Sequence, residues 1–239
     1  MQSTMSGQSI IDRALAAYAG CTTYADEGEF VLDSPGVAGL GGFRDVRPFR
    51  TRFIRPGRVL FGFDAHVQPG KRGTPPPAFA LWTGAGPGPV RWWWNLASRI
   101  TEAPDATIPI SAATGISGGT AAMLVPTLLE MDDFPGLLES VIDARAQASE
   151  EAEVLGERVG CDVVLARHPA APDEDIRLSF DARTGLLVRI EQRTGKDLEI
   201  TSIRPRTDGA VNEDELVFTP PANSRGTWWG RMVQRVFMS

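Results

Sequence analysis

The sequence predicts an α+β protein: a single domain in which helices pack on one face of a curved antiparallel β-sheet. Two groups of segments alternate between apolar and polar residues in the manner of strands, and an apolar central stretch without that alternation separates them. Short glycine-containing turns join neighbouring strands, which indicates a meander rather than βαβ units. With 239 residues, of which 42% are hydrophobic and 23% charged, the chain can bury a large core within one domain.

The chain is expected to open with a short amphipathic helix at residues 9–20. Ile10, Leu15 and Tyr18 recur at helical spacing and fall near one face. Gly20 ends this pattern, as expected for a residue that closes a helix.

Five strands are predicted in the first half of the chain: the first two alternate between apolar and polar residues, the third follows the Pro56-Gly57 turn, and the last two form a hairpin. They are residues 23–32, 49–54, 58–67, 78–83 and 90–95. The last of them carries three consecutive tryptophans, and successive side chains of a strand point to opposite faces. Trp92 and Trp94 therefore share one face and Trp93 lies on the other, which implies apolar material on both sides of the sheet.

The middle of the chain, residues 108–131, is apolar and rich in small residues, and glycines interrupt it. We interpret it as two short helices on either side of Gly118 and Gly119, with another helical turn or two at residues 134–142. Six further strands are predicted after it, at residues 151–159, 161–167, 175–181, 186–191, 197–204 and 215–219. The helices would thus lie between two halves of one sheet.

The charge pattern separates the last residues from the rest. A net charge of −6 does not favour binding to nucleic acid, because an acidic chain repels phosphate unless its basic residues cluster. Such a cluster is present at residues 225–239, which hold Arg225, Arg231 and Arg235 and no acidic residue. We therefore divide the chain into one domain at 1–224 and a basic amphipathic C-terminal tail. The tail suits an anionic membrane surface or a partner protein, and an ordinary terminal helix is the alternative.

The cysteines and the N-terminus bear on the compartment. Cys21 and Cys161 have neither CxxC spacing nor a metal-site pattern, so two separate reduced thiols are favoured over a disulfide. The apolar stretch at 10–19 is interrupted by Asp12 and Arg13, which indicates a helix instead of a signal-peptide core. The chain as given is therefore expected in the cytoplasm, or in the periplasm if a leader was removed or missed.

The sequence offers one candidate nucleophile, Ser117, within a G-x-S-x-G pattern at residues 115–119. A hydrolase of this type needs the serine on a sharp strand-to-helix turn, with a later histidine and acid. The residues before the pattern do not alternate like a strand, and His168 is the only histidine downstream. A glycine-rich helix junction is favoured over a serine hydrolase, and His66 and His168 lack metal-ligand spacing. We expect no catalytic residues, no metal and no cofactor.

Aromatic residues are concentrated in the first half of the predicted sheet. Phe61 and Phe63 share a face by strand parity, as do Trp92 and Trp94. An apolar sheet face beneath glycine-interrupted helices could enclose a ligand cavity. A plain core with tightly packed helices fits the same pattern.

Four stretches of the chain suggest a known family. They are residues 208–221 (DGAVNEDELVFTPP), 176–193 (IRLSFDARTGLLVRIEQR), 53–61 (FIRPGRVLF) and the tryptophan-bearing hairpin at 82–94. In order and spacing they resemble the LolA-like family of bacterial lipoprotein carriers and their relatives. The resemblance implies an unclosed, strongly twisted antiparallel β-barrel, here of about eleven strands, whose open mouth is covered by helices. It also implies an apolar cavity for acyl chains, although a shared fold does not by itself settle function.

The resemblance further implies candidate site residues. Arg55 matches an arginine that, in the carriers, bonds to the helical lid and keeps it closed. The side chains expected to line the cavity are Phe53, Phe61, Phe63, Trp92, Trp94, Met123, Leu124 and Leu128. We therefore expect non-enzymatic binding or carriage of a lipid or other hydrophobic ligand. A protein-interaction or sensor module that docks through its tail is the alternative, and a hydrolase using Ser117 comes after both.

Overall fold

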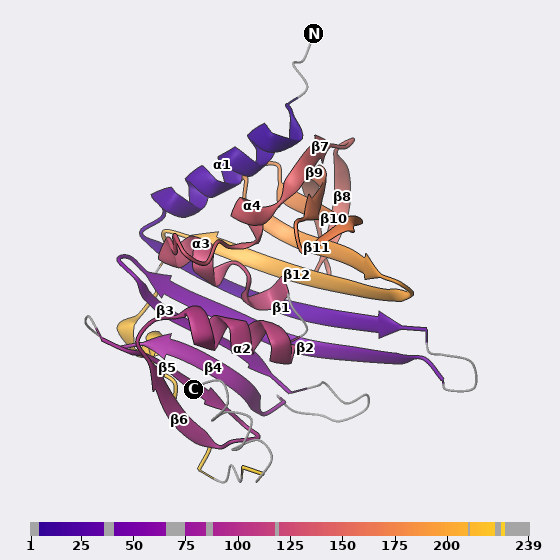
Figure 1. Cartoon of the computed structure of the whole chain (residues 1–239). Coiled ribbons are helices and arrows are strands. Elements are labelled where there is room, and N and C mark those ends of the chain that lie inside the picture. Colours follow the sequence, from indigo (N-terminus) through magenta and orange to yellow (C-terminus); the bar gives the residue numbers. More distant parts are fainter. Residues whose placement is uncertain are drawn as a thin grey trace.

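The computed structural model describes residues 5–35, 41–65, 75–84, 88–117, 120–209, 211–222 and 226–227. His66 and almost all of the predicted tail at 225–239 lie outside these ranges. The described chain forms one antiparallel sheet with helices on one face, so the predicted α+β class is confirmed (Figure 1).

The sheet has twelve strands in the order β6-β5-β4-β3-β2-β1-β12-β11-β10-β9-β7, and β8 lies off this path and pairs with β9. The strands are β1 (Thr23–Ser34), β2 (Phe43–Ile54), β3 (Arg58–Asp64), β4 (Pro77–Thr83), β5 (Val90–Trp94), β6 (Arg99–Ala103), β7 (Ile142–Ala146), β8 (Glu150–Val154), β9 (Glu157–His168), β10 (Ala171–Asp181), β11 (Leu187–Thr194) and β12 (Asp197–Thr207). Two meanders are therefore joined where β1 pairs with β12. The two ends of the path, β6 and β7, do not pair with each other in the described chain, so the half-barrel is unclosed.

The helices lie on the concave side of the sheet (Figure 1). They are α1 (Gly7–Gly20), α2 (Thr107–Ser117), α3 (Val125–Leu129) and α4 (Leu137–Ser140), with a 3-10 turn η1 (Thr120–Ala122) between α2 and α3. In α1 the Ser6 hydroxyl accepts the Ser9 N–H and so caps the helix, while Ile10, Ile11 and Tyr18 are buried. The lid, defined here as residues 107–117 and 120–140, thus lies between the two halves of the sheet in the chain, as predicted.

Three details of the predicted strands are wrong. The strand predicted at 215–219 does not form; a 3-10 turn η2 (Glu213–Leu216) stands there, stabilised by a capping box between Asn212 and Glu215. The strand predicted at 151–159 is a hairpin of β8 and the start of β9. β6 and β7 were not predicted, because each has only five residues and offers too short a pattern to be recognised as a strand.

The alternation of the tryptophans is confirmed. Trp92 and Trp94 belong to the large core between the sheet and the helices. Trp93 belongs to a second cluster on the convex face, with Trp82, Leu216 and Phe218. The Phe218 ring lies 5.3 Å from the ring of Trp93, so the segment after η2 covers the apolar material that the third tryptophan implied.

A glycine in β1 allows a close approach within the core. The side chain of Phe49 in β2 lies directly over Gly28, and a Cβ atom there would collide with that ring and with the carbonyl of Ser202. We predict that Gly28→Ala lowers the free energy of unfolding by about 1–3 kcal/mol, measured by urea denaturation. Gly160→Ala in β9 is the matched control, since a Cβ there meets nothing within 4 Å. An equal loss in both variants would contradict the steric argument.

Candidate ligand-binding site

The side chains expected to line a cavity meet in one place. Phe53 comes from β2, Phe61 and Phe63 from β3, and Trp92 and Trp94 from β5, and all five point to the concave side. Leu124 and Leu128 of the lid belong to the same cluster, and the partly buried Met123 packs against it. All eight predicted side chains therefore belong to or pack against one apolar core, and their role in binding a ligand stays a prediction.

Aromatic rings form a continuous row across the strands of the first meander. Ring centroids are 6.3 Å apart from Phe49 to Phe61 and from Phe61 to Phe63, and 5.5 Å apart from Phe63 to Phe79. Phe79 in turn lies 6.0 Å from Trp92. Phe49 and Phe79 were not among the predicted site residues, although strand parity would have placed both on this face.

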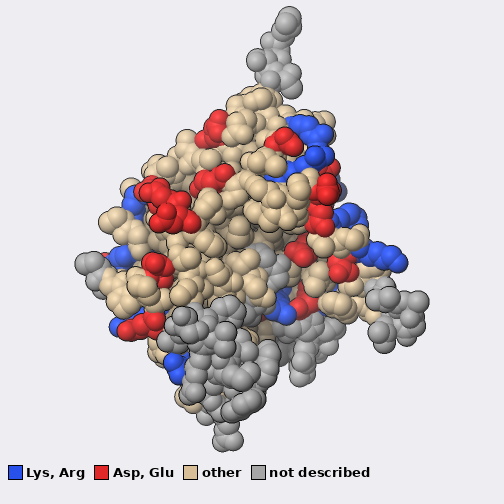
Figure 2. Space-filling model, viewed as in Figure 1, with Lys and Arg blue, Asp and Glu red and all other residues tan. Residues whose placement is uncertain are grey.

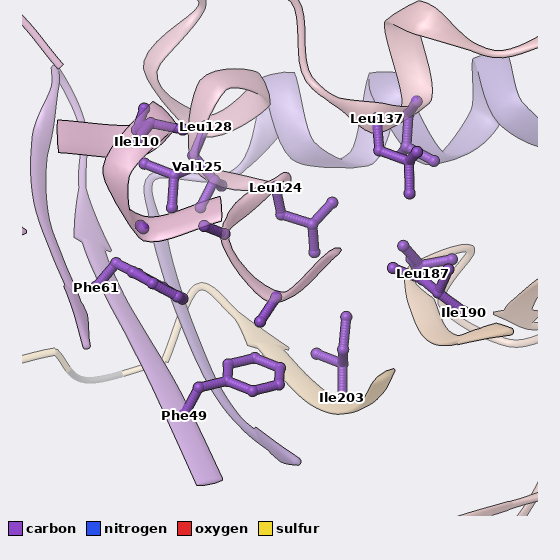
Figure 3. Close-up of a cluster of buried hydrophobic side chains, with 14 of the residues drawn as sticks. Phe49, Phe61, Ile110, Leu124, Val125, Leu128, Leu137, Leu187, Ile190 and Ile203 are labelled. Carbon is purple, nitrogen blue, oxygen red and sulfur yellow. The ribbon is translucent and has the colours of Figure 1, made fainter. Parts of the chain in front are cut away.

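The lid meets this row with aliphatic side chains. Ile110 of α2 and Val125 and Leu128 of α3 are almost fully buried against the sheet, as Figure 3 shows together with Phe49 and Phe61. The second meander also contributes side chains to this core. They were not singled out from the sequence, because they lie far along the chain from the aromatic residues that they meet. They are Leu187, Ile190 and Ile203.

The space between the sheet and the lid is closed. Phe53 and Phe61 expose 0% of their surface, and Trp92 and Leu128 expose 1%. Surface so completely covered leaves no room for water beside these side chains, so lid side chains fill this part of the half-barrel. A ligand could reach the aromatic row only if the lid moved.

Arg55, at the end of β2, joins the lid to α1 and to the sheet. Its Nε donates to the carbonyl of Cys21 over 3.0 Å, and its Nη2 donates to the carbonyl of Tyr18 over 3.0 Å. Its Nη1 lies 2.6 Å from a carboxylate oxygen of Glu130, which caps the C-terminus of α3. The guanidinium also lies 5.4 Å from the ring centre of Phe53. The lid residue that Arg55 meets, which could not be read from the sequence, is Glu130.

A groove of about 440 Å³ runs beside this ion pair, between α1 and the outer surface of the lid. Leu15 and Met131 form apolar parts of its wall, and Glu130, Asp132 and Glu139 add carboxylates. Figure 2 shows acidic side chains gathered on the face where α1 and α3 lie. Because the Glu130 side chain is 62% exposed, water screens its pairing with Arg55 and keeps that contact reversible.

A buried carboxylate lies deeper in the half-barrel, on the inward face of β1. Asp26 is 1% exposed; it accepts a hydrogen bond from the Tyr24 hydroxyl over 2.8 Å and from the Thr51 N–H over 2.7 Å. Burial raises the pKa of Asp26 to about 6, although both hydrogen bonds act in the opposite direction. Burial also raises the pKa of Tyr18, whose ring meets that of Tyr24 edge to face at 5.6 Å.

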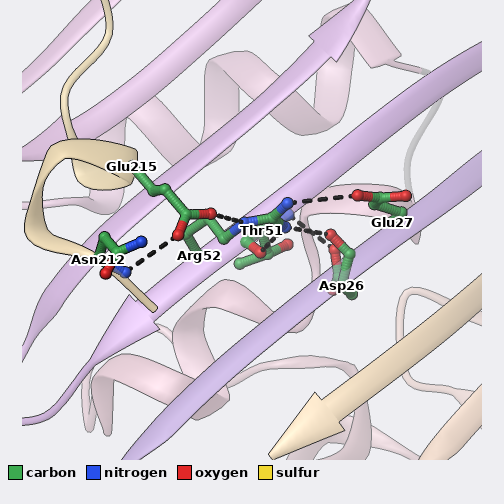
Figure 4. A network of polar contacts seen from close by, with 6 residues as sticks. All are labelled: Asp26, Glu27, Thr51, Arg52, Asn212 and Glu215. Carbon is green, nitrogen blue, oxygen red and sulfur yellow. Dashed lines mark hydrogen bonds and ion pairs between the residues drawn. The ribbon is translucent and has the colours of Figure 1, made fainter. Parts of the chain in front are cut away.

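Arg52 holds the backbone of the same two strands from the convex side. Its Nη1 donates to the carbonyls of Asp26 and Thr51, and its Nε and Nη2 meet the carboxylates of Glu215 and Glu27 (Figure 4). Asp26 was not singled out from the sequence. Its burial could have been expected from strand parity, because it shares the inward face of the strand with Tyr24 and Phe30.

The arrangement expected of a serine hydrolase is not found at the candidate nucleophile. Ser117 is the last residue of α2, not a residue on a turn between a strand and a helix. Cys21 and Cys161 are buried free thiols, and burial raises the pKa of both. Across the part of the chain that the structure describes, no three His, Cys, Asp or Glu residues are grouped to hold a metal ion. Within the same ranges, no helix has the length and apolar character needed to cross a membrane.

The fold and this interior define an open half-barrel whose apolar face is covered by a latched helical lid. No protein-family model matches the chain, and no curated protein matches its sequence. Solved structures of similar shape share few identical residues. Lipoprotein LppX from Mycobacterium tuberculosis has a TM-score of 0.45 at 12% identity, over 86% of this chain and 97% of that one.

Two further matches span this chain comparably. The MucA/MucB complex structure from Pseudomonas aeruginosa gives a TM-score of 0.42 at 15% identity, over 89% of this chain and 61% of that one. A LolA superfamily protein from Nitrosomonas europaea gives 0.36 at 8% identity, over 90% of this chain and 99% of that one. Similarity at this level concerns the fold. The unclosed half-barrel with helices over its mouth is the architecture that the LolA-like resemblance implied.

Proposed function

We propose that this protein binds or carries a lipid or another hydrophobic molecule, without catalysis, between the concave face of the sheet and the lid. One observation carries the proposal: the lid closes a continuous aromatic row and is fastened at its edge by polar contacts of Arg55.

The energetics suit an exchange of one apolar partner for another. When the lid lifts, an acyl chain takes the place of Ile110, Leu124 and Leu128 on the aromatic row, so the sheet side chains stay covered. Burying apolar surface contributes about 25 cal/mol per Å² in both states, and the two contributions largely offset each other. The ion pair of Arg55 with Glu130 of the lid then decides the balance, and its contacts with Tyr18 and Cys21 hold the guanidinium in place for that pair, which makes Arg55 a gate.

The lid helix α2 is suited to such movement. Its sequence TIPISAATGIS is built mainly from small side chains, and among residues 107–115, whose burial the structure describes, Ile110 is the one large aliphatic side chain that is fully buried. Because small side chains bury little apolar area, such a helix opens at a lower free-energy cost than the strands beneath it.

Uptake of a pyrene-labelled phosphatidylcholine by the delipidated protein tests this function. We expect saturable binding at one lipid per chain. Hydrogen exchange of amides in the lid should become faster on binding, while exchange in β10–β12 stays unchanged. Native mass spectrometry should return the lipid with its mass intact, which distinguishes carriage from hydrolysis. No uptake by a folded protein would exclude the proposal.

The predicted role of the basic tail at 225–239, as a docking segment for an anionic membrane or a partner protein, falls outside the described residues and stays a prediction. The same holds for the division of the chain at residue 224 and for the choice between cytoplasm and periplasm.

A further inference from the structure

One polar group in the concave core is left without a partner. Trp92 is 1% exposed, and its indole N–H meets no hydrogen-bond acceptor among the residues that the structure describes. Buried donors are paired in the great majority of cases, and an unpaired one is destabilising. A phenylalanine would pack on Phe79 without that penalty, so the indole N–H at this position calls for an explanation.

The surroundings of Trp92 place this donor beneath the movable part of the structure. α2 packs on β4 and β5, and it turns the side chains of Ile110, Ala112 and Ala113 toward the core. These side chains carry no acceptor. Lifting of α2 from β4 and β5 would uncover this end of the aromatic row, where the unpaired indole N–H lies.

Trp93 provides an internal comparison. Its indole N–H is also buried and unpaired, but it lies on the convex face. There Leu216 and Phe218 of the same chain cover it, and an ion pair of 2.8 Å between Arg58 and Glu213 holds that cover to the sheet. Among the described residues, Trp93 is covered by this segment and not by the lid, so it serves as a comparison for Trp92.

We propose that the Trp92 indole N–H binds the carbonyl oxygen of a neutral acyl ester that occupies the concave face. This inference rests on the proposed function and deepens it by naming the class of ligand. The indole N–H is a single uncharged hydrogen-bond donor, and the carbonyl oxygen of an ester is an uncharged acceptor that can pair with it. A carboxylate buried at the same point would keep most of its desolvation cost, which favours an ester over a free fatty acid.

The test compares two ligands that differ in the acceptor, methyl oleate and 1-octadecene, by equilibrium partition into the delipidated full-length protein. In Trp92→Phe we expect the affinity for methyl oleate to fall roughly fivefold while that for 1-octadecene stays within twofold. Replacement of Trp92 by 3-benzothienylalanine, which keeps the ring shape and exchanges N–H for sulfur, should have the same effect without loss of volume.

Trp93→Phe is the matched control, since it removes an equally unpaired donor from the opposite face and should leave both affinities as in the wild type. An unchanged methyl oleate affinity in the benzothienylalanine protein would overturn the role of Trp92 while leaving lipid binding intact. Failure of the wild-type chain to take up either ligand would instead overturn the proposed function, and this inference with it.

Discussion

An Arg55→Met variant is expected to take up pyrene-labelled phosphatidylcholine about tenfold faster than the wild-type chain and to unfold at a lower urea concentration. The change keeps an unbranched stem as far as the position of Nε and removes the contacts of Arg55 with the carbonyls of Tyr18 and Cys21 and with Glu130. Hydrogen bonds to a charged group contribute about 1.5–3 kcal/mol when shielded, and exposure of Glu130 reduces this to about 1–2 kcal/mol. A shift of about 1.4 kcal/mol toward the open lid corresponds to the tenfold rate.

Two further variants separate the gate from a general loss of stability. Glu130→Gln removes the ion pair on the lid and leaves the contacts of Arg55 with α1, so a smaller increase, about threefold, is expected. Arg91→Met breaks an exposed pair with Glu102 on β6 and should leave uptake unchanged. If uptake by Arg55→Met matched the wild type while its stability fell, Arg55 would be a structural residue and not a gate.

The second large effect concerns Asp26. Its pKa is about 6 in the folded protein against 3.8 for an ordinary aspartate, because burial disfavours the charged form. The folded state therefore holds this proton more tightly than the unfolded chain does. The stability that protonation confers is fully present below pH 3.8 and is lost as the pH rises through 6, by about 3 kcal/mol in all.

Asp26→Asn cannot lose a proton and so escapes this penalty. Urea denaturation between pH 4 and pH 8 should show the variant gaining on the wild type as the pH rises, with most of the gain complete by pH 7. Tyr24→Phe removes a hydrogen bond that lowers the pKa of Asp26, so it should move the wild-type loss of stability to higher pH. Parallel pH curves for Asp26→Asn and the wild type would show that the buried group keeps its ordinary pKa.

The faces of the strands were predictable because they follow from local geometry. A period of two places Trp92 and Trp94 on one side and Trp93 on the other whatever the partner strands are, and the structure confirms it. The same rule fails at residues 215–219. There ELVFT contains the β-branched and aromatic residues typical of a strand, but the Asn212–Glu215 capping box and the packing of Phe218 on Trp93 hold the segment as η2 and a cover.

The contacts that shape the candidate site were not predictable, because they join residues far apart in the chain. Arg55 could be singled out by its motif. Its partner Glu130 is 75 positions away and comes within reach only because α3 packs against α1. Burial of Asp26 likewise depends on β2 and the lid closing over the inward face of β1, which converts an ordinary strand carboxylate into one with a raised pKa.

The sequence by itself determined the class of fold, the inward and outward faces of most strands, and the set of apolar side chains that meet beneath the lid. Those properties depend on neighbours along the chain and on the burial of apolar surface, which is non-directional. The tertiary structure alone decided that the lid is shut, that Arg55 fastens it through Glu130, and that the Trp92 N–H is left unpaired. Hydrogen bonds and ion pairs are directional and short in range, so they exist only once the chain has brought their two ends within about 3 Å.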